Sequence, residues 1–183
     1  MIRLAGAALL LALLAAFALL AARPAPPAGN VRVSAAPTPA PAAQRAALRR
    51  ALALVGTRDR LGHRLVLAAP RAGVRAQIDA GARTITVFLD PADPAHRIAH
   101  DIAHELGHAW DRAHLDDRAR RAYLRGRGAP DVAWWPRGAG DDYATGAGDF
   151  AEVFARCHAA SPEFRSRLAP PPGDACAAIR TAS

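Results

Sequence analysis

The stretch HRIAHDIAHELGHAWDRAH, from His96 to His114, carries five of the seven histidines of the chain. Within it, His104 and His108 are four residues apart, and Glu105 follows the first of them. About one helical turn separates residues at this spacing, so both imidazoles can face one metal ion about 2.1 Å away. Glu105 could then take a proton from a water held by that metal. The pattern H-E-x-x-H on a helix therefore predicts a metal site, and two neutral histidines with a carboxylate suit Zn²⁺.

The segments around this helix predict one α+β domain with a small, mainly antiparallel sheet. Two segments, 74–79 and 84–90, alternate apolar and polar residues, and a turn joins them, as in a hairpin. A short apolar run at 63–70 adds a further strand. Helical periodicity and end signals place helices at 43–56, 94–112, 116–125 and 148–160.

The helix expected at 148–160 begins GDFAEVFA and carries two acids, Asp149 and Glu152. Together, HELGH and GDFAE resemble the gluzincin branch of the zincin metallopeptidases. Similar pairs occur in compact gluzincins such as the anthrax lethal factor catalytic domain and the Pro-Pro endopeptidases, and in exported actinobacterial proteins. The resemblance covers roughly residues 84–158. It implies a zincin-like fold with an active-site helix and a second metal-site helix, and a zinc-dependent endopeptidase.

The resemblance also implies roles for individual residues. His104 and His108 would be zinc ligands and Glu105 the general base. Glu152 would orient a ligand histidine, and Tyr143 would stabilise the oxyanion of the tetrahedral intermediate. The strand Thr84–Asp90 would be an edge strand along which the substrate peptide lies extended.

The third ligand is where the chain departs from the family pattern. Gly148 stands where a ligand glutamate would be, and glycine offers no side chain to a metal. Asp149 is the nearest carboxylate and is the predicted third ligand, with Glu152 and His114 as alternatives. His114 would complete a metzincin-like motif, but a continuous helix places it about 120° from the ligand face. A metzincin also needs a methionine turn, and the single methionine of the chain is Met1.

The N-terminal residues predict export. After Met1-Ile-Arg, an apolar run from Leu4 to Ala22 is long enough to cross a bilayer, at roughly 28 Å. We interpret residues 1–22 as a signal peptide or uncleaved membrane anchor. Residues 23–43 are interpreted as a Pro/Ala-rich linker, and residues 44–183 as the catalytic domain. In an extracytoplasmic location the two cysteines, Cys157 and Cys176, are expected to form a disulfide.

Charge adds little to the functional prediction. All 24 basic residues are arginine and the formal net charge is +8. Export and the lack of a basic-aromatic stripe argue against a nucleic-acid partner. The sequence thus predicts an exported or membrane-tethered zinc endopeptidase that is a monomer. A non-catalytic zincin-fold envelope binding protein, or an arginine-rich envelope protein whose histidines only sequester metal, would be the alternatives.

Overall fold

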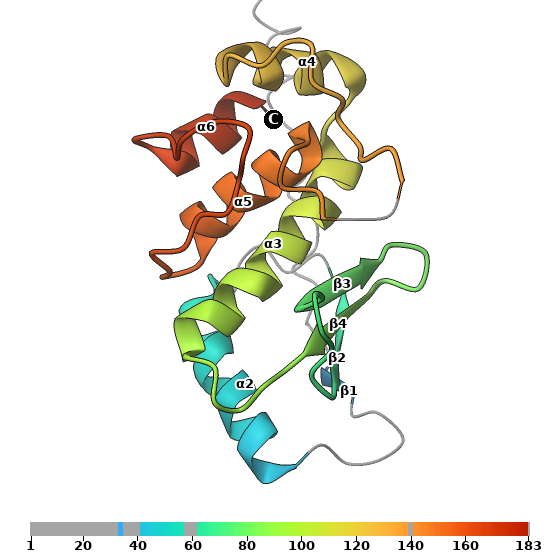
Figure 1. Cartoon of the computed structure of the whole chain (residues 1–183), viewed down its shortest axis with the longest axis vertical. Coiled ribbons are helices and arrows are strands. Elements are labelled where there is room, and N and C mark those ends of the chain that lie inside the picture. Colours follow the sequence, from blue (N-terminus) through green and yellow to red (C-terminus); the bar gives the residue numbers. More distant parts are fainter. Residues whose placement is uncertain (1–32, 35–40, 57–61, 139–140, 183) are drawn as a thin grey trace, which may run out of the picture.

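The computed structural model describes residues 33–34, 41–56, 62–138 and 141–182 of the 183-residue chain. A small mixed sheet lies beside a group of helices, with the long helix α3 between them (Figure 1). In chain order the elements are β1 (Val33–Ser34), α2 (Ala42–Leu54), β2 (Arg64–Ala68), β3 (Ala76–Asp79), β4 (Thr84–Phe88), α3 (Ala95–His114), α4 (Asp117–Gly126), α5 (Gly146–His158) and α6 (Ala175–Ala182). The predicted α+β class is confirmed at this level.

The sheet is mixed, and most of its pairings are parallel. Its strand order is β1-β2-β4-β3. The predicted hairpin is present, since β3 and β4 pair antiparallel from Ala76–Val87 to Asp79–Thr84. However, β4 also pairs with β2 in parallel, and β1 pairs with β2 in parallel. The expectation of a mainly antiparallel sheet is therefore wrong, because the chain passes from β2 to the far edge before it returns along β4.

This strand order corrects the prediction that Thr84–Asp90 is an edge strand. β4 has neighbours on both sides, while β3 forms an edge of the described sheet. The side chains of Ile85 and Val87 are buried, as suits a central strand. Alternation of side chains reports which face of a strand is buried. It does not report how many neighbours the backbone has, so the sequence could not separate edge from centre.

Helices α3 and α5 form the centre of the helical part. The apolar residues Ile98, Ile102 and Leu106 of α3 are buried, and Phe150 and Phe154 of α5 are inaccessible to solvent. The two backbones approach closely at Gly107 of the HELGH motif. A Cβ built on Gly107 would lie 2.8 Å from the Cα of Ala151 on α5. Glycine at this position therefore allows the crossing that brings Glu152 of α5 to the histidines of α3.

The predicted N-terminal segments fall mostly outside the part of the chain that the structure describes. Residues 1–22, the predicted signal peptide or anchor, lie outside the described residues, as does most of the predicted linker. Within the linker, Val33–Ser34 pairs with Leu65–Val66 and so belongs to the sheet. Among the helices that are described, none is long and apolar enough to cross a membrane.

The two cysteines are joined, as predicted. The disulfide Cys157–Cys176 links the end of α5 to the start of α6, with a Cα–Cα distance of 4.9 Å. It closes the chain around the segment between these helices, which packs against the candidate site.

Candidate metal centre

Three side chains meet at one face of α3. His104 and His108 come from the HELGH motif, and Asp142 comes from the loop before α5. The Nε2 atoms of the two histidines are 3.2 Å apart. Asp142 places Oδ2 2.8 Å from Nε2 of His108 and Oδ1 3.6 Å from Nε2 of His104. Ligands at about 2.1 Å around a tetrahedral zinc would be roughly 3.4 Å apart. The group of two imidazoles and one carboxylate could therefore hold a metal ion.

Glu152 fixes the orientation of His104. Its side chain is inaccessible to solvent, and Oε1 lies 2.8 Å from Nδ1 of His104. Nε2 of His100 lies 3.1 Å from both carboxylate oxygens, and the backbone N–H of Arg165 donates to Oε2. A Nδ1–H donated to this carboxylate leaves Nε2 of His104 directed at Asp142 and His108. Glu152 thus has the contacts expected of a residue that orients a ligand.

The electrostatics of the group favour a proton on His104 when no metal is present. Burial opposes protonation, but hydrogen bonds to Asp142 and Glu152 outweigh it and raise the pKa of His104 to about 10. Burial of Asp142 and Glu152 would raise the pKa of each carboxyl group. Their hydrogen bonds to the histidines outweigh this effect and hold both pKa values well below the usual range. Both acids are therefore carboxylates at neutral pH.

Gly148 explains how a loop residue reaches this position. A Cβ built on Gly148 would lie 2.1 Å from the carbonyl oxygen and 2.9 Å from Cγ of Asp142. Only glycine lets the loop pack so closely on the first turn of α5. The Asp142 carbonyl also accepts hydrogen bonds from the backbone N–H and the hydroxyl of Thr145, each 2.8 Å long. The close approach at Gly148 thus sets the loop that carries the Asp142 carboxylate against the start of α5.

Asp149, the predicted third ligand, has a different role in the structure. Its buried carboxylate accepts hydrogen bonds from the Tyr123 hydroxyl (2.7 Å), the Arg127 guanidinium (2.7 and 3.0 Å) and the Ser166 hydroxyl. These bonds tie α5 to α4 and to the segment after α5. Asp142 therefore takes the place of Asp149 as the third candidate ligand. The sequence signal for Asp142 was its position beside Tyr143, together with a glycine six residues later.

His114, the metzincin-like alternative, lies outside the group. α3 runs without a break to this residue, and the imidazole stacks on Trp110 with 3.9 Å between ring centroids. Asp111, which stands where the metzincin pattern has glycine, is fully buried. It accepts hydrogen bonds of 2.8 Å from Arg120 and from the Trp134 indole. Asp111 thus anchors the following segments, and the helix does not turn to bring His114 back.

The two predicted catalytic residues lie beside the group. Glu105 is buried on α3, next to His104. Its negative charge contributes to the raised pKa of His104. The Tyr143 ring lies 5.6 Å from the His104 ring, centroid to centroid. The Tyr143 hydroxyl accepts a hydrogen bond of 3.4 Å from Arg165, and burial raises its pKa.

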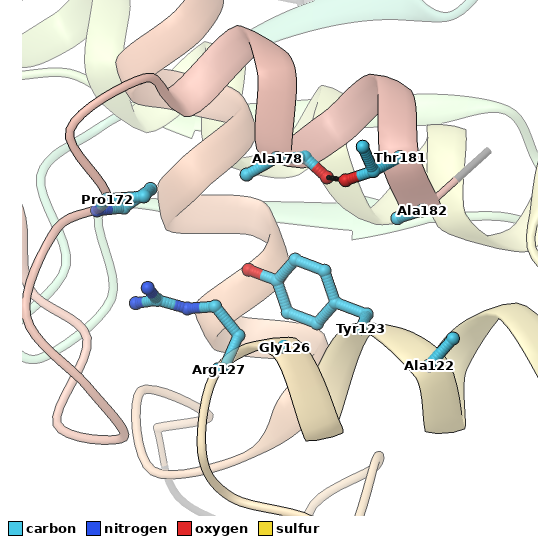
Figure 2. Close-up of a pocket in the computed structure, with 8 residues that line it drawn as sticks. All are labelled: Ala122, Tyr123, Gly126, Arg127, Pro172, Ala178, Thr181 and Ala182. Atoms are coloured by element: carbon cyan, nitrogen blue, oxygen red, sulfur yellow. Dashed lines mark hydrogen bonds between the residues drawn. The ribbon is translucent and has the colours of Figure 1, made fainter.

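A separate pocket of about 340 Å³ lies between α4 and α6. Figure 2 shows Tyr123 and Arg127 on one side of it, and Ala178, Thr181 and Ala182 on the other. The polar groups of Tyr123 and Arg127 are bound to Asp149. None of the lining residues belongs to the His104–His108–Asp142 group.

A scan of the chain against protein-family models, and searches against curated proteins and solved structures, gave no match.

Proposed function

We propose that the chain is a zinc-dependent endopeptidase of the gluzincin-like kind, exported or tethered to a membrane by residues 1–22. The observation that carries the proposal is the convergence of His104, His108 and Asp142, with donor separations that suit a tetrahedral ion. The H-E-x-x-H motif supplies both the imidazoles and an adjacent carboxylate. The disulfide is in keeping with an oxidising, extracytoplasmic location.

In this mechanism the ligands and the general base have separate roles. His104, His108 and Asp142 hold the metal, and Glu152 keeps Nε2 of His104 directed toward it. When bound, zinc would lower the pKa of a coordinated water toward about 7 and polarise a peptide carbonyl. Glu105 accepts the proton from the attacking water and passes it to the leaving amine. The Tyr143 ring lies 5.6 Å from the His104 ring, centroid to centroid, and its hydroxyl would donate to the developing oxyanion.

The corrected sheet suggests where a peptide substrate would bind. β3 is the antiparallel edge strand of the described sheet, and it packs near α3. An extended peptide could add to its open edge through backbone hydrogen bonds. This edge replaces Thr84–Asp90 as the proposed binding strand.

The test is zinc content and hydrolysis of a denatured, fluorescently labelled protein by the full chain. We expect one zinc per chain, and a Glu105→Gln variant that keeps the metal but cleaves more than about 100-fold more slowly. His104→Ala should lose both metal and activity. Zinc binding without hydrolysis by the wild type would support the alternative, a non-catalytic zincin-fold binding protein. Equal rates for wild type and Glu105→Gln would exclude the proposed mechanism.

A further inference from the structure

The segment Glu163–Pro170, here called the strap, runs between α5 and α6 and packs over the elements of the candidate metal centre. It has no regular secondary structure, but its hydrogen bonds reach several elements. Arg165 donates through its backbone to Glu152 and through its guanidinium to Asp101. The carbonyl groups of Ala169 and Pro170 accept hydrogen bonds from Arg127. The strap is therefore a fixed part of the structure around the site.

Arg167 of the strap binds both residues that flank Asp142. Its backbone N–H donates to the carbonyl oxygen of Tyr143 at 2.7 Å. Its guanidinium forms an ion pair with the carboxylate of Asp141. The same guanidinium lies 5.9 Å from the centroid of the Tyr143 ring. One strap residue thus holds the chain on either side of the candidate ligand.

This contact matters because Asp142 lies in a loop. His104 and His108 are placed by α3, and Glu152 by α5, whereas Asp142 precedes the first turn of α5. Thr145 and Gly148 hold its carbonyl against α5. Those contacts fix the Asp142 backbone against α5, and Arg167 binds the residues on either side of Asp142.

We infer that Arg167 is a positioning residue for the metal centre, holding the Asp141–Tyr143 loop so that the Asp142 carboxylate meets the two imidazoles. The inference rests on the proposed metal-binding function and adds a residue that acts through its bonds to Asp141 and Tyr143. Its effect is on metal affinity, because a ligand on a less ordered loop must be ordered when the metal binds.

Because the Arg167–Asp141 ion pair is exposed, its effect on metal binding can be measured separately from any effect on fold stability. The side chains of Arg167 and Asp141 are 55% and 49% exposed. Exposed ion pairs contribute little to fold stability. Removing the pair should therefore leave the thermal stability of the metal-free protein nearly unchanged. Loss of residues that orient metal ligands lowers affinity by about 10- to 100-fold. Because the backbone hydrogen bond from Arg167 to Tyr143 remains, we expect zinc affinity to fall by about tenfold, the lower end of this range.

The experiment measures zinc affinity of the full chain by competition with a chromogenic chelator, and melting of the chelated protein. The variants are Arg167→Ala, Asp141→Asn and the double variant. Arg180→Ala is the matched control, since Arg180 is 70% exposed and 3.9 Å from Asp174. We expect about tenfold weaker binding in each single variant, no further loss in the double variant, and no change in the control.

The outcomes distinguish this inference from the proposed function. Wild-type protein that binds no zinc would overturn both. Tight zinc binding by the wild type with unchanged affinity in Arg167→Ala would overturn the inference alone. The inference would also fail if Arg180→Ala lost as much zinc affinity as Arg167→Ala. It would fail as well if the affinity loss in Arg167→Ala came with a large drop in the melting temperature of the chelated protein.

Discussion

The backbone of Asp142 occupies the space in which a side chain on residue 148 would begin. A Cβ on Gly148 would lie 2.1 Å from the Asp142 carbonyl oxygen, a distance that no stable contact allows. The absence of a carboxylate at position 148 and the presence of one at Asp142 are therefore linked. Glycine at position 148 leaves room for the loop that carries the Asp142 carboxylate.

Gly148→Ala should weaken zinc binding although it changes no candidate ligand. The added methyl group must push the Asp142 backbone away from α5, so we expect a loss of about 10- to 100-fold in zinc affinity and about 1–3 kcal/mol of stability. Chelator competition and denaturant unfolding measure the two effects. Gly126→Ala is the control, because a Cβ there meets nothing within 4 Å. Unchanged zinc affinity in Gly148→Ala would contradict the packing relationship.

Substitution of the two neighbouring aspartates should have opposite consequences. Asp142→Ala removes a candidate ligand, and we expect it to lose zinc while the chelated protein remains folded. Asp149→Ala leaves Arg127 buried without its ion-pair partner, which should cost about 3–5 kcal/mol of stability. Zinc titration and urea unfolding of both chelated variants decide between the two roles. A stable Asp149→Ala protein that no longer binds zinc would restore Asp149 as the ligand.

The sequence predicted the elements of the fold better than their arrangement. The helix containing His104 and His108, the hairpin of β3 and β4, and the helix containing Glu152 all follow from local periodicity and end signals. The parallel pairing of β2 with β4 depends on backbone hydrogen bonds between distant segments. Side-chain patterns carry no record of such bonds.

The candidate site shows the same division between local and long-range information. His104 and His108 share one helix, so their convergence follows from helical geometry. Asp142 reaches them only because the loop folds back on α5 at Gly148. Asp149 is closer in sequence to the expected ligand position. However, it is bound by Tyr123, which lies in α4, and by Arg127, which directly follows α4. A single sequence does not reveal these partners.

Removal of the disulfide should destabilise the protein. The Cys157–Cys176 bond closes a loop of about 20 residues, which restricts the unfolded chain and contributes about 3 kcal/mol. We expect a Cys157→Ser/Cys176→Ser variant to unfold at a lower urea concentration, with its free energy of unfolding reduced by this amount. Because the strap lies within the loop, its hydrogen exchange should increase more than that of α3. Equal stability of the oxidised wild type and the double variant would contradict this expectation.

The proton on His104 should make zinc affinity and metal-free stability respond to pH in opposite directions. The pKa of His104 in the folded, metal-free protein is raised from its ordinary value of 6.5 to about 10, because its hydrogen bonds to Asp142 and Glu152 outweigh burial. Zinc needs the unprotonated Nε2, so the metal must displace this proton below pH 10. Apparent affinity should then rise about tenfold per pH unit between pH 7 and 9.

The stability of the metal-free fold changes with pH in the opposite direction. A pKa that is higher in the folded than in the unfolded state stabilises the fold fully below about pH 6.5, and this contribution is lost as the pH rises toward 10. Zinc titrations and melting of the chelated protein across this range measure both slopes, and calorimetry in two buffers counts the released proton. His114→Ala is the control and should leave both slopes unchanged, since His114 lies outside the group. Zinc affinity that is constant from pH 7 to 9 would show that His104 carries no proton for the metal to displace.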